Sequence, residues 1–570
     1  MPGQHRATIR TGYHRYWGHD FRPDYRRLRD LIGALAPGLP VLATTATANA
    51  RVTADVAEQL GTGSESALVL RGPLDRESLR LSVLNLPDAA SRLGWLAEHL
   101  PELPGSGIIY TLTVAAAAET ADFLRSRGYE VSSYTGRTGD EERQQGERDL
   151  LDNKIKALVA TSALGMGFDK PDLGFVVHLG APSSPIAYYQ QIGRAGRGVE
   201  RAEVVLLPGV EDKEIWRYFT SLAFPPQATV ERVLEALGGA TRTLSTMALE
   251  PLVDLKRSRL ELLLKVLDAD GAVKRVQGGW ISTGQPWFYD AERYARITAA
   301  REAEQRAMLE YATTGECRME FLRRQLDDPG AERCGRCDNC TGERRDATVN
   351  ASVVDAAGSH AKRAWVTIEP RRQWPTGMSA VGVNLKGKIP ADEQAAEGRA
   401  LARLTDLGWG AALRDLLGTG VPDQPVRPQL LGAMVNVLKE WAANDAPGGP
   451  WSGAGRPVGI VVINSRTRPQ LVASLAEGIA EIGRLPIAGG VDRVRDEGHS
   501  GPSNSAWRLR SVSEAFDLGP QLRERLAECP GPVLLVDDLV DSGWTMTVAA
   551  RLLRQAGAPA VLPLVLALAG

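Results

Sequence analysis

The 570 residues lack any apolar run long enough to cross a membrane, and the first residues lack the apolar core of a signal peptide. The formal net charge is only −2, so no global field attracts nucleic acid and any basic surface has to be local. Cysteine is scarce, with five in the chain. These absences predict a cytoplasmic protein without a membrane partner, and the length predicts about three to five domains.

Residues 107–209 alternate between the periodicities of strands and helices. Apolar runs such as "GIIYTL" and "GFVVHLGAP" are separated by helical stretches such as "VAAAAETADFLRSRG". This alternation predicts βαβ units, a mostly parallel sheet and a multi-domain α/β fold. It resumes at Val458. Between the two regions, residues 346–450 are rich in Pro, Gly and Ala and are interpreted as a linker or irregular region.

The cysteines are clustered rather than scattered. Four of the five lie within 24 residues: Cys317, Cys334, Cys337 and Cys340. Four thiolates are the ligands that tetrahedral zinc prefers in a structural site, whereas the alternative is buried thiols without a metal. The spacing therefore predicts one structural Zn²⁺ per chain, and Cys529 is read as an ordinary core or surface residue.

A glycine-rich turn and an arginine pair follow the predicted strands. One strand ends at Thr161, and Gly165 and Gly167 allow a sharp backbone turn beside a ligand. In "YYQQIGRAGR", Arg194 and Arg197 are expected on one short helical turn, where two guanidinium groups can stabilise charge on a transferring phosphoryl group. An unrelated α/β domain with coincidental glycines is the alternative.

Over roughly residues 16–345 the chain resembles the RecQ family of ATP-dependent DNA helicases, because "WGHDFRPDYRRL", "LATTATA", "ATSALGMGFDKPD" and "YYQQIGRAGR" occur in the family's order. The resemblance implies a 3′–5′ helicase of DNA repair and recombination, associated with the nucleoid, that uses ATP and Mg²⁺ on single-stranded or forked DNA. It implies catalytic roles for Gln190, Arg194 and Arg197. It implies nucleotide contacts for Gly165, Gly167 and Asp169, and DNA contacts for Trp17, His19, Phe21, Arg22 and Thr161. The cysteine spacing is also that of the family's zinc module.

One half of an ATP site is missing from the sequence. No lysine is followed by Ser or Thr, so the phosphate loop G-x-x-x-x-G-K-[ST] is absent, and "IRTGYHRY" has no carboxylate where the family's Mg²⁺-binding pair stands. Residues 1–75 are therefore interpreted as the remnant of a first RecA-like domain and 76–215 as a complete second one. We expect that the chain alone neither hydrolyses ATP nor unwinds DNA, whether its start is truncated or a separate polypeptide supplies the missing half.

Residues 225–290 read as three short helices and a hairpin around Gly278-Gly279, a pattern typical of a winged helix. The recognition helix would carry Lys256, Arg257 and Arg259, and the wing would carry Lys274 and Arg275. A structural helical domain with solvated charges is the alternative. This segment precedes the zinc module (291–345), whereas in the bacterial relatives it follows the module.

The last predicted domain, 451–570, contains "VLLVDDLVDSGWT". An apolar strand ends in Asp537 and Asp538, and the next loop opens a helix whose amides and hydroxyls suit phosphate. The segment resembles the phosphoribosyl pyrophosphate site of type I phosphoribosyltransferases. The resemblance implies binding of phosphoribosyl pyrophosphate with Mg²⁺ through Asp537, Asp538, Asp541, Ser542, Gly543, Thr545, Ser465 and Arg466. "DEGHSGPSNSAWRLRSV" would be a loop over the site.

Three functions therefore stay open for the whole chain. The first is a RecQ-like helicase. The second is a phosphoribosyltransferase or nucleotide sensor targeted to DNA, and the plain alternative for its domain is a Rossmann-like unit with an acidic turn, since a fold does not fix a function. The third is a non-catalytic DNA-binding adaptor.

Overall fold

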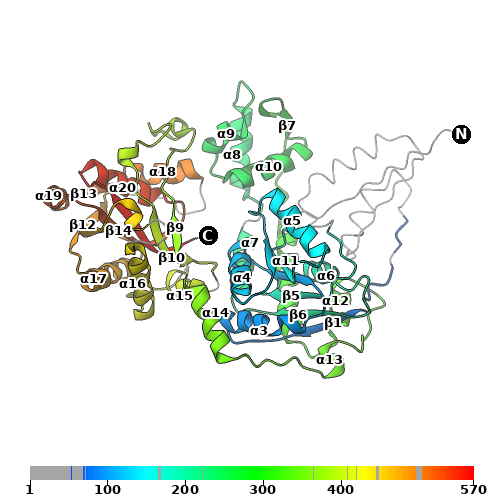
Figure 1. The fold of residues 1–570 in the computed structure, drawn as a ribbon. Helices are drawn as coiled ribbons and strands as arrows, with labels where there is room; N and C mark the ends of the chain where they lie inside the picture. The colour runs from blue at the N-terminus through cyan, green and yellow to red at the C-terminus, as the bar shows by residue number, and fades with distance from the viewer. Residues whose placement is uncertain are drawn as a thin grey trace. The chain divides into compact units, whose positions relative to one another are not determined.

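The computed structural model describes Thr53 and residues 68–70, 72–164, 168–221, 224–363, 365–406, 408–418, 420–443, 449–495 and 504–569. The chain divides into two compact units (Figure 1). The first comprises residues 1–224, 268–270 and 287–361, and the second comprises residues 225–267, 271–286 and 362–570. Within the described ranges, no helix combines the length and apolarity needed to cross a membrane.

The first unit is built on a six-stranded parallel sheet with the order β1-β6-β5-β2-β4-β3. Its strands are β1 (Leu79–Val83), β2 (Gly107–Thr111), β3 (Val131–Tyr134), β4 (Ala157–Ala160), β5 (Phe175–Leu179) and β6 (Ala202–Leu207). Every residue of β2, β4 and β6 is buried, as in parallel sheets covered on both faces. The strands expected in residues 107–209 are confirmed, and β1 is an additional edge strand.

Helices cover both faces of this sheet. They are α3 (Ala89–His99), α4 (Val114–Ser126), α5 (Asp140–Leu151), α6 (Pro185–Ile192), α7 (Asp212–Ser221), α11 (Ala291–Thr313), α12 (Arg318–Gln325), α13 (Asp338–Thr341) and α14 (Ala351–Arg363). One core joins Leu96 of α3 and Phe123 of α4 to the sheet. The other joins Leu150 of α5, Ile192 of α6 and Leu322 of α12 to its opposite face. The zinc module thus shares a core with the RecA-like domain.

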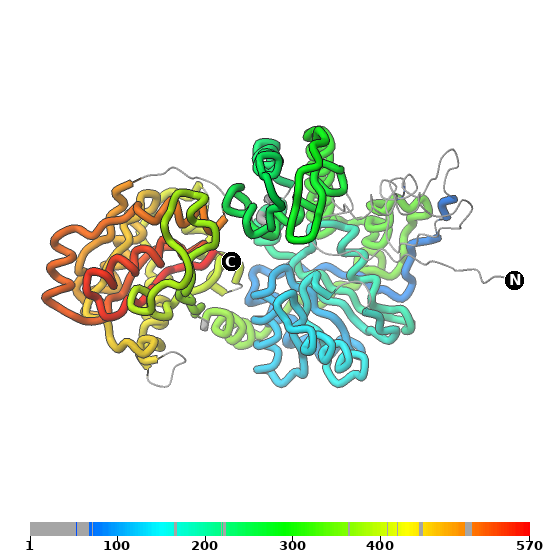
Figure 2. Tube along the Cα trace, turned by 90° about the horizontal axis from the view of Figure 1, so that it is seen from above, coloured from blue at the N-terminus to red at the C-terminus, as the bar shows by residue number. Residues whose placement is uncertain are grey.

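The second unit contains a seven-stranded sheet with the order β13-β12-β11-β14-β15-β10-β9. Its strands are β9 (Val366–Ile368), β10 (Gly398–Arg403), β11 (Gly459–Ile463), β12 (Ile487–Arg493), β13 (Phe516–Leu518), β14 (Val533–Val540) and β15 (Val561–Leu568). The five central strands are parallel and the two edge strands, β9 and β13, are antiparallel. The yellow-to-red course of the chain in Figure 2 follows this sheet and its helices.

The helices of this sheet also form two layers. One core is lined from α15 (Gly410–Leu417), α16 (Pro428–Ala442) and α17 (Pro469–Gly483). The other is lined from α18 (Ser505–Ser513), α19 (Pro520–Glu528) and α20 (Trp544–Gln555). The domain is therefore an α/β sandwich with helices on both faces.

The interpretation of residues 346–450 as a linker or irregular region was wrong. They contain α14, β9, β10, α15 and α16, and β10 pairs in parallel with the C-terminal strand β15. These elements were missed because the segment has few strand-like runs. Strand β10 is hydrogen-bonded to a strand that lies more than 150 residues further along the sequence. The expected loop over the acidic site also differs, since its described end, Asn504 onward, opens helix α18.

Residues 225–286 contain the three helices and the hairpin that the sequence predicts. The helices are α8 (Gln227–Gly238), α9 (Thr246–Leu249) and α10 (Arg257–Ala269), with a 3₁₀ turn at Glu250–Leu252. The hairpin consists of β7 (Val273–Val276) and β8 (Gly279–Ser282), which are antiparallel. The turn falls at residues 277–278, as the paired glycines indicated.

Candidate functional site: the cysteine cluster and two phosphate-type loops

The four clustered cysteines come together in space. Their sulfur atoms all lie within 4.8 Å of one another, and the Sγ atoms of Cys317 and Cys337 are 4.0 Å apart. Zinc–sulfur bonds of about 2.3 Å in a tetrahedron put sulfurs about 3.8 Å apart, so the four thiols fit one Zn²⁺. Cys317 occupies the N-cap of α12, in the short connection after α11.

Two of the four thiols are disfavoured as thiolates when no cation is bound. A hydrogen bond to Cys334, helped by burial, raises the pKa of Cys337 to about 12, and burial raises the pKa of Cys317. Backbone amides point at the same sulfurs, since Arg318 N donates to Cys337 Sγ over 3.4 Å and Cys334 N donates to Cys317 Sγ over 3.2 Å. Such a site holds thiolates only when a dication compensates them, which is the chemistry of structural zinc.

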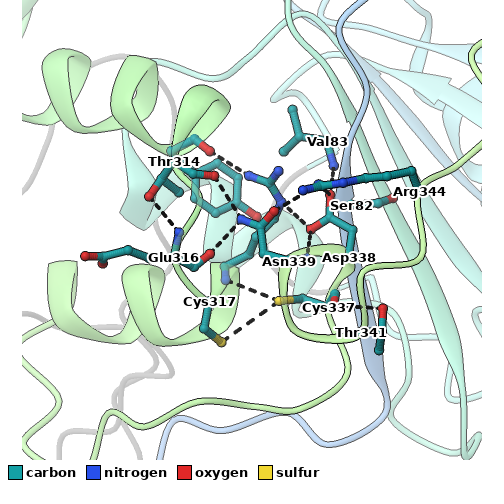
Figure 3. Close-up of polar contacts among 12 residues, drawn as sticks. Ser82, Val83, Thr314, Glu316, Cys317, Cys337, Asp338, Asn339, Thr341 and Arg344 are labelled. Carbon is teal, nitrogen blue, oxygen red and sulfur yellow. Dashed lines mark hydrogen bonds and ion pairs between the residues drawn. The ribbon is translucent and has the colours of Figure 1, made fainter.

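Asp338 connects the cysteine knuckle to the RecA-like sheet through a buried ion pair and a backbone hydrogen bond (Figure 3). Asp338, next to Cys337, accepts from Arg318 Nε over 2.6 Å, and both side chains are under 5% exposed. The other carboxylate oxygen accepts from the backbone N of Val83 in β1 over 3.1 Å. Because Asp338 joins α12, α13 and β1, a change at the metal site reaches the sheet directly.

The two arginines of the "GRAGR" segment lie after α6 and point to different partners. Arg194 donates to the backbone carbonyls of Leu164 and Phe168, each over 3.2 Å. Arg197 is exposed and pairs with Asp169 over 2.8 Å. The expectation that both share a helical turn was wrong, because α6 ends at Ile192.

Glycine is required between these arginines. Gly196 has a φ of +71°, and a Cβ there would lie 2.3 Å from Ser78 Oγ. Arg76 closes the same corner by donating to Ala195 O over 3.2 Å. An open cavity of about 690 Å³ borders this corner and is lined by Arg76, Arg80 and Arg197 together with acidic and small residues. The three arginines are matched by three carboxylates in the same lining, so the cavity carries no net positive charge.

The other residues expected at the helicase site differ in burial, and some of them lie outside the described residues. Thr161 is buried, and its hydroxyl accepts from Ala163 N over 3.3 Å, so it shapes the turn after β4. Gln190 is half-buried on α6. Six expected site residues lie outside the described residues: Trp17, His19, Phe21, Arg22, Gly165 and Gly167.

The basic residues of the 225–286 segment gather at the start of α10 and on the hairpin. Lys256 and Arg257 are exposed, Arg259 is half-buried, and Arg257 lies 3.5 Å from Glu261. On the hairpin, the guanidinium of Arg275 lies 5.7 Å from the centre of the Trp280 ring. The charges expected for nucleic-acid contact are thus largely on the surface of this segment.

The acidic loop of the second unit (residues 541–543) follows β14, beside β11. Asp537 and Asp538 lie before it, inside the strand, which runs to Val540, so the expectation that the strand ends at these two residues was wrong. Strand order reverses between β11 and β14, which is the position where open α/β sheets bind ligands. Asp537 and Asp538 are each 7% exposed. Burial, followed by the carboxylate of Asp538, raises the pKa of Asp537 well above its usual value. The loop continues through Asp541, Ser542 and Gly543 into α20, where Thr545 is half-buried.

Three arginines surround this loop, and the sequence did not single them out. Arg468 pairs with Asp538 over 3.1 Å, Arg508 pairs with Asp541, and Arg371 donates to the carbonyl of Ser542 over 2.7 Å. Of the two residues expected after β11, Ser465 accepts from Arg468 N over 3.0 Å, and the exposed Arg466 reaches the carbonyl of Arg493. Arg468 was visible in "SRTRPQL", whereas Arg371 and Arg508 come from segments far from the loop.

Parts of this chain are similar to known proteins. Residues 92–199 match the helicase conserved C-terminal domain, and residues 286–341 match the RecQ zinc-binding domain. The chain is 30% identical over 344 residues to ATP-dependent DNA helicase RecQ of Synechocystis sp., covering 57% of this chain and 68% of that protein. It is 34% identical over 223 residues to the probable ATP-dependent DNA helicase RecS of Bacillus subtilis, covering 38% of this chain and 44% of that protein. A solved structure of Mycobacterium smegmatis helicase Lhr, bound to ssDNA and AMP-PNP, aligns over 50% of this chain and 41% of its own, with a TM-score of 0.31 and 18% identity.

A parallel RecA-like sheet that shares its core with a four-cysteine module defines a helicase C-terminal domain with a RecQ-type zinc-binding module. The chain belongs to the RecQ family of DNA helicases.

Proposed function

We propose that the first unit works as the ATP-sensing and zinc-bearing half of a DNA helicase that acts on single-stranded or forked DNA in unwinding, recombination and repair. The observation that carries the proposal is the corner around Gly196. Arg197 is exposed there beside an open cavity, while Arg194 holds the backbone of Leu164 and Phe168 in place. An exposed arginine on a rigid turn can reach a γ-phosphate held by a facing domain.

ATP hydrolysis needs a phosphate-loop lysine, and the 570 residues contain none in that context. The lysine and the Mg²⁺-binding carboxylates therefore have to come from a further segment of the same protein or from a separate polypeptide. In this function Arg197 stabilises the charge that develops on the transferring phosphoryl group, and Arg194 positions the loop beside it.

The test is a chimera that places the first RecA-like domain of the Synechocystis RecQ relative before residue 68. We expect DNA-stimulated ATP hydrolysis from the chimera and none from the 570 residues alone. Arg197→Ala should lower kcat of the chimera by about 10³-fold or more, the usual contribution of an arginine finger. Arg217→Ala is the matched control, because Arg217 is 74% exposed and pairs with Glu214 on its own helix. Equal loss in both variants would contradict the assignment, and so would ATP hydrolysis by the chain alone.

A second function is proposed for the second unit, namely binding of phosphoribosyl pyrophosphate with Mg²⁺. Its support is the acidic loop at the point of strand reversal, with the arginines Arg371, Arg468 and Arg508 arranged around it. The carboxylates of Asp537 and Asp538 suit ribose hydroxyls and Mg²⁺, and the arginines suit phosphate oxygens.

This second proposal predicts a thermal shift. Phosphoribosyl pyrophosphate with Mg²⁺ at 100 times its dissociation constant should stabilise the domain by about 2.7 kcal/mol. Asp538→Asn should reduce the shift, whereas ribose 5-phosphate and inorganic phosphate should shift the wild-type chain less. No shift with phosphoribosyl pyrophosphate at millimolar concentration would leave the loop a structural role.

DNA binding without ATP hydrolysis in the chimera would then favour a non-catalytic adaptor.

A further inference from the structure

A buried asparagine joins the 225–286 segment to helix α18 of the C-terminal domain. Asn504 is 2% exposed and caps α18, where its Oδ1 accepts from the backbone N of Ala506 and of Trp507, each over 3.0 Å. Its Nδ2 donates to Glu250 O over 2.6 Å and to Val253 O over 2.8 Å. Both hydrogens and the oxygen of the amide are thus used, so no other side chain of this size fills the position equally well.

Neighbouring contacts hold the same segment, residues 250–254. Asn504 N donates to Asp254 Oδ1 over 3.1 Å, and Trp507 Nε1 donates to Pro251 O over 3.1 Å. Gly377 has a φ of +78°, and a Cβ there would lie 2.3 Å from the Pro251 ring. The segment is therefore packed closely between two parts of the C-terminal domain. Four hydrogen bonds therefore join segment 250–254 to Asn504 and Trp507, and the side-chain donor of Asn504 is buried. A buried polar group that is fully hydrogen-bonded is typical of a specific contact.

One end of this contact leads to the basic residues that the sequence predicts to meet DNA, and the other end leads to the proposed phosphoribosyl pyrophosphate site. On one side, Leu255 separates the segment from Lys256 and Arg257, the exposed basic residues at the start of α10. On the other side, Arg508 follows Trp507 on α18 and pairs with Asp541. Helix α18 also packs on α20, which begins at the acidic loop. One short segment and one helix therefore connect the basic residues of α10 to the acidic loop.

We propose that segment 250–254 is a coupling contact: it positions α18, and through Arg508 the acidic loop, according to the state of the basic helix α10. Asn504 and Trp507 are the positioning residues. A phosphate ester at the loop and DNA at α10 then change each other's affinity by the same factor, because coupling between two binding sites is reciprocal. The ligand half of this inference rests on the proposed phosphoribosyl pyrophosphate site and on the expected DNA contact at α10, whereas the contact itself rests on neither.

The contact is tested without any ligand by hydrogen exchange of the full chain. Asn504→Asp keeps the cap, because a carboxylate still accepts from Ala506 N and Trp507 N, but it loses both donors to segment 250–254. We expect amide exchange in residues 250–254 and 541–545 to accelerate about tenfold, a change of about 1.4 kcal/mol in local opening. Trp507→Phe should act in the same direction, since it keeps the ring and removes only the donor to Pro251.

The matched control is Asn436→Asp, on the exposed face of α16. It should leave both peptides at the wild-type rate, and exchange in the zinc module should not change in any variant. Faster exchange at 250–254 with no change at 541–545 would overturn the coupling, because the contact would then be local.

The ligand arm uses phosphoribosyl pyrophosphate with Mg²⁺. In the wild-type chain it should slow exchange at 541–545 and also at 250–254, whereas in Asn504→Asp it should slow exchange at 541–545 alone. Protection confined to 541–545 in the wild type would contradict the coupling. Protection of neither peptide would refute the proposed ligand site, and the ligand-free comparison then decides the contact by itself.

Discussion

The buried pair between Arg318 and Asp338 provides the sharpest prediction for the first unit. Asp338→Asn keeps the shape of the side chain but leaves the guanidinium of Arg318 buried with its charge uncompensated. Removing one partner of a buried ion pair costs about 3–5 kcal/mol. In domains of roughly 150–250 residues, each kcal/mol lowers Tm by about 2–4 °C. The first unit is somewhat larger than that, so the expected loss is at most about 6–20 °C.

The assay is thermal unfolding of the full chain, with zinc release followed in parallel by a chromogenic chelator. Zinc release reports the cysteine knuckle alone, so it separates the first unit from the second. Release should begin at lower temperature in Asp338→Asn, because Asp338 directly follows the ligand Cys337 and also holds Val83 of the sheet.

The control is Asp122→Asn on α4, whose partner Arg125 is 48% exposed while Asp122 itself is 57% exposed. Exposed pairs contribute about 0.2–1 kcal/mol, so this variant should melt within a few degrees of the wild type. If Asp338→Asn melted with the control and released zinc at the wild-type temperature, the reasoning about the buried pair would be refuted.

Three further predictions concern zinc, pH and DNA. Purified protein should contain about one zinc per chain, and a chelator that removes it should lower the Tm of the first unit; protein purified without chelator and free of zinc would contradict this. Burial lowers the pKa of His178 to about 4, so the unfolded chain binds more protons between pH 6.5 and 4 and stability falls as the pH drops through that range. At pH 5 the loss should be about 2 kcal/mol relative to pH 7, and a His178→Gln variant with the same pH slope as the wild type would show the reasoning to be wrong. Lys256→Ala with Arg257→Ala should reduce the slope of log K against log salt for duplex DNA by about 1.8 if both contact phosphates, whereas an unchanged slope would remove α10 from the interface.

The parts of the structure that local patterns encode could be predicted from the sequence. Alternating apolar and helical runs predicted the strands of residues 107–209, and the "CGRCDNC" spacing predicted a cluster that the structure brings within 4.8 Å. Strand β1 was missed although Leu79, Leu81 and Val83 alternate with polar residues, a signal that was available.

The rest depends on pairings between distant segments, which leave no local trace. Strand β10 is defined by β15, and Arg371 and Arg508 reach the acidic loop from two separate segments that both precede it in the sequence. The arginine pair could not be placed from the sequence for the same reason. The spacing of Arg194 and Arg197 suggested one shared helical turn, but α6 ends at Ile192 and the two side chains contact different partners. The periodicity of an element can be read from the local sequence, whereas the partner of a side chain depends on how distant segments pack.

The central claim, that this RecQ-family chain engages single-stranded or forked DNA, is tested most directly by equilibrium binding to forked and blunt duplexes between 50 and 200 mM salt. We expect tighter binding to the fork, with log K falling linearly with log salt as phosphates are neutralised. Equal affinity for both DNAs that does not change with salt, or no binding to either at the lowest salt, would contradict it.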